Sequence, residues 1–277
     1  MPELPELEVV SEVLNRRVVA RTITRVEVIA PGGSIVLRDL TGRGLEAAVT
    51  HDRFTGVRRR GKFLIFSLQA ASDLALVINP KLTGRLQLAT SGDKRYVKTA
   101  LVFTFDDGQE LRYVDQKTMG QVYLTMRLGD APGFAAMGPE ALDISPAAFK
   151  ERLRPFRGEI KGVLVRSEFV AGIGNAYADE ILWAARLHPY RKRTQLTDAE
   201  IDRLYAAMRA TLLEATDKMR VEMGENIHRE PRTFLNVHLR TGEPCPRCGA
   251  PIALVGANQR ITNFCRTCQP GGLIKGM

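Results

Sequence analysis

The most informative stretch of the chain is residues 245–268, CPRCGAPIALVGANQRITNFCRTC. It contains all four cysteines of the protein, in two C-x2-C pairs separated by sixteen residues. Each pair can present two thiolates to one tetrahedral ion, and the residues between the pairs are numerous enough for a hairpin that brings them together. The spacing predicts a zinc ribbon in which one structural Zn2+ is held by Cys245, Cys248, Cys265 and Cys268.

Two disulfide bonds are the alternative arrangement for four cysteines. Disulfides are typical of secreted chains, but the first residues, Met1 to Glu6, are acidic where a secretory signal is basic. No window approaches the roughly 18 uninterrupted apolar residues that a membrane span requires. We therefore expect zinc rather than disulfides, no membrane association, and a soluble protein of the cytoplasm.

The charge balance predicts a polyanionic partner. The chain has 277 residues, with 40 Lys and Arg against 31 Asp and Glu, which gives a net charge of +9. A basic protein of this kind binds phosphate backbones through ion pairing and counterion release. Basic residues are concentrated between Arg53 and Lys62, whereas the first twelve residues include four glutamates. The length favours two domains.

Periodicity predicts one helix followed by a β-domain in the first half of the chain. Pro5 can occupy the first turn of a helix that continues with apolar residues at helical spacing. The turn signals between the apolar segments that follow predict an antiparallel sandwich or barrel. The expected strands are Thr22–Ala30, Phe63–Leu68, Leu74–Asn79, Lys98–Phe105, Glu110–Val114 and Gln121–Thr125.

The second half is predicted to be helical up to about Met223. Residues 129–145 are rich in glycine and proline and resemble a linker. Ser145 and Pro146 can then cap and begin a helix. Thr197 and Glu200 form a capping box before another helix, whose apolar stripe is Ile201, Leu204, Tyr205, Met208 and Leu212.

The start of the chain can also supply chemistry. Removal of Met1 would leave Pro2 with a free secondary amine, and an α-amino group with a pKa near 8 is partly neutral at physiological pH. A neutral amine can attack the sugar C1′ of a damaged nucleotide and expel the base. Glu3 and Glu6 would then handle protons. The plainer alternative is that these carboxylates only complement the helix dipole.

Five motifs in order resemble the formamidopyrimidine-DNA glycosylase and endonuclease VIII family. They are Pro2–Glu8, Arg59–Leu64, Gly172–Glu180, His188-Pro189 and the cysteine-rich end, and together they span residues 2 to 269. The resemblance is closer to the formamidopyrimidine branch. It implies an α+β fold, in which an N-terminal helix and an antiparallel β-sandwich precede a helix-two-turn-helix domain with a zinc ribbon. The expected domains are 1–128, a linker at 129–145, then 146–235 and 236–277.

The resemblance also implies catalytic roles. Pro2 would be the Schiff-base nucleophile, Glu3 the proton donor for base release, and Glu6 a supporting carboxylate. Lys62 would contact a phosphate or donate a proton in β-elimination. Arg260, in the zinc ribbon, would bind a phosphate beside the lesion and take part in δ-elimination.

Further residues are implied in DNA binding. Asn175, at the start of the second helix of the helix-two-turn-helix element, would hold a phosphate together with backbone amides. Lys161 and Lys98 match phosphate contacts of the family, Lys98 in place of a histidine.

The sequence departs from the family where three side chains fill the space left by the flipped base. The formamidopyrimidine branch has methionine, arginine and phenylalanine, and this chain has Leu82, Lys117 and Met119. Lysine lacks the planar fork of arginine, so we expect weaker discrimination of the opposite base. The segment 222–232, which in the family folds over the flipped base, matches no familiar sequence, and a lone histidine such as His228 is more often plain surface.

The resemblance, together with the residues at the start of the chain, implies a base-excision repair enzyme, a DNA glycosylase with abasic-site lyase activity. It would remove oxidised bases, above all oxidised purines such as 8-oxoguanine and formamidopyrimidines, from double-stranded DNA, and would act as a monomer. The alternatives are an abasic-site lyase without glycosylase activity and a non-catalytic protein that binds damaged DNA.

Overall fold

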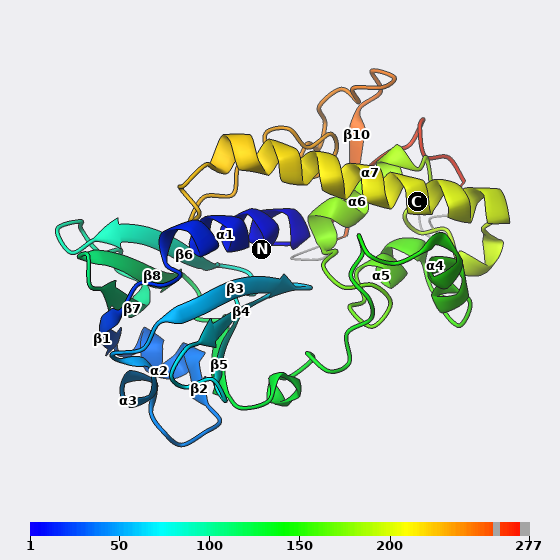
Figure 1. The fold of residues 1–277 in the computed structure, drawn as a ribbon. Coiled ribbons are helices and arrows are strands. Elements are labelled where there is room, and N and C mark those ends of the chain that lie inside the picture. The colour runs from blue at the N-terminus through cyan, green and yellow to red at the C-terminus, as the bar shows by residue number, and fades with distance from the viewer. Residues whose placement is uncertain (257–260, 272–277) are drawn as a thin grey trace. The chain divides into compact units, whose positions relative to one another are not determined.

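The computed structural model describes residues 1–256 and 261–271, and the chain divides into two compact units (Figure 1). The first unit comprises residues 1–136 and 218–231, and the second comprises residues 137–217 and 232–277. Each unit is therefore built from two separate parts of the chain. None of the helices in the described ranges is long and apolar enough to cross a membrane.

Two β-sheets form the body of the first unit. The four-stranded sheet is antiparallel, with the order β1 (Ile23–Val28), β7 (Thr99–Phe105), β8 (Gln109–Asp115) and β6 (Gly84–Thr90). The five-stranded sheet has the order β2 (Leu37–Asp39), β9 (Gln121–Thr125), β5 (Ala75–Asn79), β4 (Phe63–Leu68) and β3 (Phe54–Arg60). All neighbours are antiparallel except β2 and β9.

A cluster of phenylalanine rings joins the two sheets. The ring centroid of Phe54 lies 5.0 Å from that of Phe66 in its own sheet. It lies 6.0 Å from Phe103 and 6.4 Å from Phe105, which belong to the other sheet. Tilted and edge-on contacts at these distances are favourable between aromatic rings. The sheets thus pack as a sandwich, as the resemblance implied.

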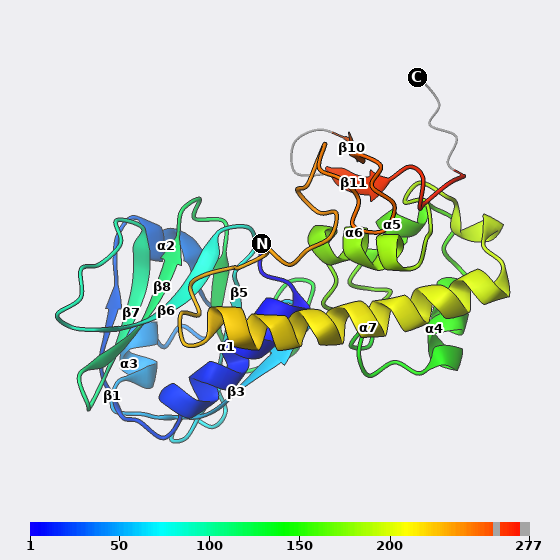
Figure 2. The same cartoon turned by 90° about the horizontal axis from the view of Figure 1, so that it is seen from above.

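Helix α1 (Leu4–Arg17) packs against β3 and β4 of the first unit (Figures 1 and 2). Its apolar side chains, among them Leu7, Val10 and Leu14, are buried. Glu3 and Glu6 form a capping box at its start, and Pro5 lies in its first turn as predicted. Two short helices, α2 (Gly32–Val36) and α3 (Leu45–Val49), and the 3-10 turn η1 (Leu128–Asp130) complete the unit.

The second unit is mostly helical. Its elements are α4 (Pro146–Leu153), α5 (Ile160–Leu164), α6 (Asn175–Ala184), the 3-10 turn η2 (Arg193–Gln195), the first part of α7 (Asp198–Met223), and the strands β10 (Ile252–Val255) and β11 (Thr262–Cys265). The predicted cap at Ser145 is confirmed, because its hydroxyl accepts a hydrogen bond from the Ala148 amide. The capping box of Thr197 and Glu200 is also present.

The six predicted strands are all present, but β2, β3 and β6 of the first unit were not predicted. In β3 the run Arg58–Arg60 suggests a solvated basic segment rather than a strand. The structure buries Phe54 and Val57 on the inner face of β3. Arg59 pairs with Glu8 of α1 at 2.6 Å, so part of this charge is neutralised within the fold.

A buried carboxylate holds the loop after β4. Asp52 is 5% exposed and accepts hydrogen bonds from the backbone amides of Arg53, Ala70 and Ala71 at 2.7, 2.8 and 2.9 Å. Burial by itself raises the pKa of Asp52, but these amide donors outweigh burial and lower it. A group with a lowered folded-state pKa stabilises the fold above its unfolded pKa, and that contribution is lost as the pH falls through the folded value.

We expect Asp52→Asn to destabilise the protein by about 1–3 kcal/mol at pH 7, because an amide group cannot accept all three bonds. The loss should shrink as the pH is lowered through the acid range, where the carboxyl of the parent protein becomes protonated. Urea unfolding at pH 7 and at decreasing pH measures both effects. Asp73→Asn is the matched control, since Asp73 forms an exposed ion pair with Arg43. Equal losses for the two variants would contradict the assignment.

Candidate active site and zinc centre

The beginning of α1 places three predicted catalytic residues together. Pro2 is buried, and Glu3 and Glu6 are each 1% exposed. The Glu3 backbone amide donates to Glu6 Oε2 at 3.0 Å. These carboxylates are therefore withdrawn from solvent beside the proline, and at least Glu6 also caps the helix. The plain capping role and a chemical role are compatible here.

Lys62 lies in the tight turn between β3 and β4. Gly61 makes this turn possible with a φ of +56°. The Lys62 side chain is half-buried, and burial lowers the pKa of its ammonium group. The Glu3 carboxylate opposes this shift and raises the pKa, whereas Lys81 lowers it further. Lys62 and Glu3 thus lie within electrostatic reach of each other.

A narrow cavity opens beside Pro2. Its volume is about 20 Å3, enough for about one water molecule. Residues from α1, from both sheets and from the segment 218–231 line it, among them Pro2, Glu6, Arg85, Tyr113, Ile227 and Glu230. The segment that the sequence could not interpret therefore forms one wall of the cavity next to the candidate nucleophile.

Glu230 is a site residue that the sequence did not indicate. Its Oε2 lies 2.7 Å from Arg85 Nη2 and 3.6 Å from the amino nitrogen of Met1. No motif includes Glu230 or Arg85, and the two residues are far apart in the chain. Only the folded chain brings this ion pair to the N-terminus.

The loops that carry the candidate void-filling residues converge on Asp115, which is fully buried. Its carboxylate accepts hydrogen bonds from the Thr83 hydroxyl and from the backbone amides of Lys117, at 3.2 Å, and Gly120, at 2.7 Å. The Lys117 amide also donates to the Thr83 hydroxyl at 3.1 Å. Asp115 thereby ties the loop after β8 to the loop before β6.

The side chains on these loops are accessible to a ligand. Lys117 and Met119 are exposed, and Leu82, next to Thr83, is half-buried. Lys98 is exposed as well, and its carbonyl accepts a hydrogen bond from the Asp115 amide at 3.0 Å. The four predicted DNA-binding residues of the first unit therefore surround one buried carboxylate.

The other two predicted DNA-binding residues meet the zinc ribbon inside the second unit. Asn175 is the first residue of α6, as expected, and its side-chain amide donates to the Ile261 carbonyl at 2.8 Å. The Lys161 ammonium donates to the same carbonyl at 2.9 Å and to the Thr262 hydroxyl at 2.8 Å. It also pairs with Asp179 at 2.6 Å. Both side chains thus hold the beginning of β11.

Two further carboxylates anchor the ribbon to α6. Asp179 accepts from the Asn263 amide at 3.1 Å and lies 2.8 Å from His238 Nδ1. Glu180 accepts from the backbone amides of Val237 and His238 at 2.8 and 2.9 Å. Both carboxylates belong to the Gly172–Glu180 motif, but their anchoring role is visible only in the fold.

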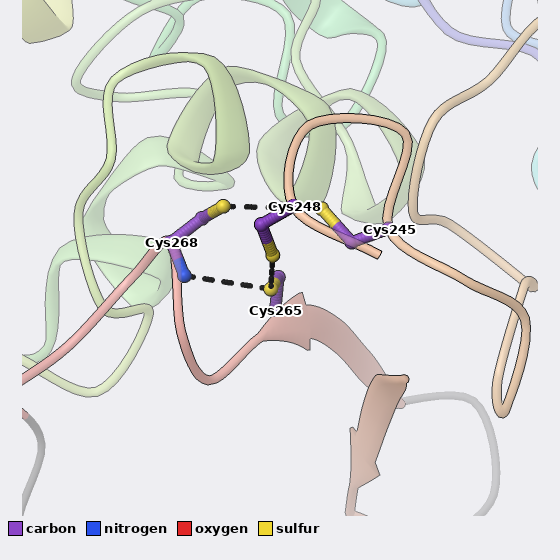
Figure 3. A group of neighbouring side chains, drawn as sticks. All are labelled: Cys245, Cys248, Cys265 and Cys268. Carbon is purple, nitrogen blue, oxygen red and sulfur yellow. Dashed lines mark hydrogen bonds between the residues drawn. The ribbon is translucent and has the colours of Figure 1, made fainter. Parts of the chain in front are cut away.

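The four cysteines gather at the base of the β10–β11 hairpin (Figure 3). Their sulfur atoms all lie within 4.8 Å of one another. The Cys245 and Cys268 sulfurs are 3.9 Å apart, and those of Cys248 and Cys265 are 3.4 Å apart. Four sulfurs about 2.3 Å from a tetrahedral zinc ion would be separated by about 3.8 Å. A disulfide requires about 2.05 Å, so these distances fit zinc and exclude the disulfide arrangement.

The protein therefore has a site for one structural zinc ion, as the spacing predicted. With four thiolate ligands the ion has no open position, and it supplies folding energy rather than a reactive centre. Trp183 of α6 donates to the Cys245 sulfur at 3.4 Å, which connects the site to the helical part of the unit. Arg260, predicted to lie on this ribbon, falls outside the described residues.

Three family models match consecutive parts of the chain. Residues 1–122 match the formamidopyrimidine-DNA glycosylase N-terminal domain, and residues 136–226 match the H2TH domain of the same enzymes. Residues 242–271 match the zinc finger found in formamidopyrimidine-DNA glycosylase and isoleucyl-tRNA synthetase.

Whole-chain relatives agree with these matches. The formamidopyrimidine-DNA glycosylase of Symbiobacterium thermophilum is 40% identical over 98% of this chain and 90% of its own length. That of Chloroflexus aurantiacus is 36% identical, with 97% and 98% covered. A crystal structure of Lactococcus lactis Fpg with abasic-site DNA has a TM-score of 0.86 at 32% identity, with 97% of this chain and 100% of that chain covered. A MutM complex with carbocyclic 8-oxo-G DNA has a TM-score of 0.84 at 33% identity, with 98% and 100% covered.

Proposed function

Because the chain belongs to the formamidopyrimidine-DNA glycosylase family, we propose that it removes oxidised purines from double-stranded DNA and then cuts the abasic strand. The protein is a DNA glycosylase with a structural zinc finger. The relatives named above are bacterial enzymes, so we also propose that it acts in the cytoplasm, as a monomer.

The observation that carries this proposal is the position of Pro2 among buried carboxylates at the edge of a cavity. In the proposed reaction the Pro2 amine attacks C1′ of the damaged nucleotide, and the C1′–N bond to the base breaks. Glu3 delivers the proton that the leaving base or the sugar oxygen needs. The resulting iminium acidifies the C2′ hydrogen, which allows β-elimination of the 3′-phosphate.

Lys62 has a role in the same proposal. Burial lowers the pKa of its ammonium group, so the group gives up a proton more readily than a solvated lysine does. It can protonate a departing oxygen during elimination or bind the adjacent phosphate. Arg260 is proposed to contact a phosphate beside the lesion and to take part in δ-elimination.

Target selection is proposed to depend on the loops around Asp115. Leu82 and Met119 would fill the space left by an extruded base, and Lys117 would face the opposite base. A single ammonium cannot make the two parallel hydrogen bonds by which arginine recognises a base edge. Lys98 and Asn175 would contact the DNA backbone. The three donors of the Lys161 ammonium are taken by Ile261, Thr262 and Asp179, so Lys161 would support the phosphate contact by holding the start of β11.

Cleavage of pre-existing abasic sites is the second candidate function, and the substituted loop residues Leu82, Lys117 and Met119 favour it. These residues would have to support extrusion of an intact damaged base. An abasic sugar carries no base and needs no such extrusion.

Trapping with borohydride tests both candidates. Duplexes with 8-oxoguanine, an oxidised pyrimidine or an abasic site are incubated with the protein and reduced. We expect a covalent adduct at Pro2 with the oxidised purine and with the abasic site. The rates for the oxidised purine should differ by less than about tenfold between cytosine and the other opposite bases, since Lys117 lacks the arginine fork.

The remaining outcomes separate the alternatives. An adduct with abasic DNA alone would leave only the lyase. Tight binding of all duplexes without any adduct would identify a non-catalytic binder of damaged DNA and would refute both enzymatic functions.

A further inference from the structure

The carboxylate of Glu230 faces the N-terminus from segment 218–231, in the cavity that Pro2 and Arg85 also line. We propose that Glu230 accepts the proton of the Pro2 ammonium before the amine attacks the sugar, and that Arg85 holds the carboxylate in place. This inference rests on the function proposed above. It assigns a catalytic proton acceptor to a segment that no sequence motif covers.

The distances support this role. Glu230 Oε2 lies 3.6 Å from the Met1 nitrogen. When Met1 is removed, the free amine is the Pro2 nitrogen, which is three bonds away from the Met1 nitrogen. Covalent geometry keeps the Pro2 nitrogen within about 7 Å of Glu230 Oε2. The freed end of the chain, which Met1 no longer extends, can span this gap while Arg85 holds the carboxylate. In the processed protein, the amine and the carboxylate therefore have each other within reach.

A vacant acceptor on Glu230 supports it independently. Oε2 is held by Arg85 at 2.7 Å. Oε1 is buried and receives no hydrogen bond from the residues that the structure describes. A buried acceptor without a donor is costly, and the N–H groups of the processed Pro2 ammonium can supply that donor. One oxygen thus positions the side chain while the other remains available for the proton.

The other carboxylates near Pro2 already have structural tasks. Glu6 Oε2 accepts the Glu3 amide at 3.0 Å within the capping box. Glu3 interacts with the Lys62 ammonium. Glu230 comes from a different segment, so it can take up a proton without weakening the start of α1.

Arg85 holds the Glu230 carboxylate in place, and its positive charge also acts on the nearby amine. An uncompensated carboxylate next to the amine would stabilise its ammonium form and oppose attack. The guanidinium at 2.7 Å offsets that charge. The charged and titratable groups around this site are Glu3, Glu6, Lys62, Lys81, Arg85, Tyr113, Arg229 and Glu230.

The proton balance is simple with an abasic site as substrate. The Pro2 ammonium gives one proton to Glu230, and the amine nitrogen forms a bond to the aldehyde carbon C1′. The electron pair of the carbonyl π bond moves to the oxygen, which takes the second proton of the nitrogen. The oxygen then leaves as water with the proton returned from Glu230, and nitrogen and C1′ form the iminium.

The test measures trapping of abasic DNA against pH, under single-turnover conditions, with protein whose intact mass confirms loss of Met1. A positioned proton acceptor contributes on the order of a hundredfold. We expect Glu230→Gln to trap about 10- to 100-fold more slowly near pH 6.5. Near pH 9.5 it should come within about twofold of the parent protein, because the amine, with a pKa near 8, is then already neutral.

Three further variants make the result specific. Glu230→Asp should recover part of the rate at pH 6.5, since it restores a carboxylate. Arg85→Gln keeps the acceptor but removes its counter-charge, so its profile should also move to higher pH. Glu225→Gln is the matched control, because Glu225 lies on the same segment in an exposed ion pair with Arg17, and it should follow the parent protein at every pH.

Two results overturn the inference. If Glu230→Gln traps at the parent rate throughout the pH range, or is slowed equally at every pH, Glu230 is not the proton acceptor. In both cases adduct formation by the parent protein leaves the proposed function intact. If the parent protein itself forms no adduct at any pH, the proposed function fails and this inference fails with it.

Discussion

A protein extended by glycine and serine before Pro2 should form no borohydride-stable adduct with abasic DNA. Its strand cleavage should slow by at least about a thousandfold, as is typical when an enzyme loses its nucleophile. The extension turns the Pro2 nitrogen into an amide, whose lone pair is delocalised into the carbonyl group and cannot attack C1′. Single-turnover cleavage assays and gel analysis of the reduced complexes measure both effects.

The competing amine in this experiment is Lys62. Burial lowers the pKa of its ammonium group, and it lies within electrostatic reach of Glu3. An extended protein that still traps DNA, with the adduct mapped to a Lys62 peptide, would contradict the assignment of Pro2. The affinity of the extended protein for abasic duplex and its melting temperature serve as controls, because only the chemistry should change.

Replacing Cys265 with alanine should abolish zinc binding and unfold the ribbon. Cys265 is fully buried at the end of β11, and structural zinc contributes about 10–16 kcal/mol to the folding of comparable small sites. A two-stranded hairpin cannot replace that energy with its own core. We expect one zinc ion per parent chain, none in the variant, and an affinity for duplex DNA at least about tenfold lower.

Thr267→Ala is the matched control for the zinc experiment. Thr267 is exposed and lies between two of the ligands, so its loss should change neither metal content nor DNA affinity. Metal analysis and a binding titration at fixed salt measure these outcomes. A parent protein that contains no zinc, or a ribbon that keeps its fold after chelation, would refute the structural role.

Local chemistry explains which elements were predictable. Capping signals at Ser145, Thr197 and Glu200 are satisfied within three or four residues, and the structure confirms them. Strands with apolar runs between turns were also found. Strand β3 was missed because its arginines resemble a solvated surface, and one of them is neutralised by Glu8, 51 residues away in the chain.

The residues of the candidate site also fall into a group that the sequence could predict and a group that it could not. The four cysteines could be assigned because ligand type and spacing define tetrahedral coordination, and their sulfur positions confirm it. Pro2, Glu3 and Glu6 could be grouped because Glu3 directly follows Pro2 and Glu6 lies one helical turn further on. In contrast, no sequence pattern indicated a role for Asp115, which organises the loops around Lys117. One of its hydrogen-bond partners, Thr83, lies in a different loop between strands.

Residue type and short-range spacing were sufficient for the zinc ribbon, the helix caps, most strands and the family motifs, because these features depend on interactions between residues close in sequence or on ligand chemistry. Three features became visible only in the folded chain. They are the Glu230–Arg85 pair, the hydrogen bonds that Asp115 accepts from two loops, and the anchoring of β11 by Lys161 and Asp179. The partners in each of these interactions lie far apart in sequence. The sequence around a charged residue does not indicate which residue it will pair with. Burial and distance, which are properties of the fold, decide whether such a residue is a solvated charge or part of a site.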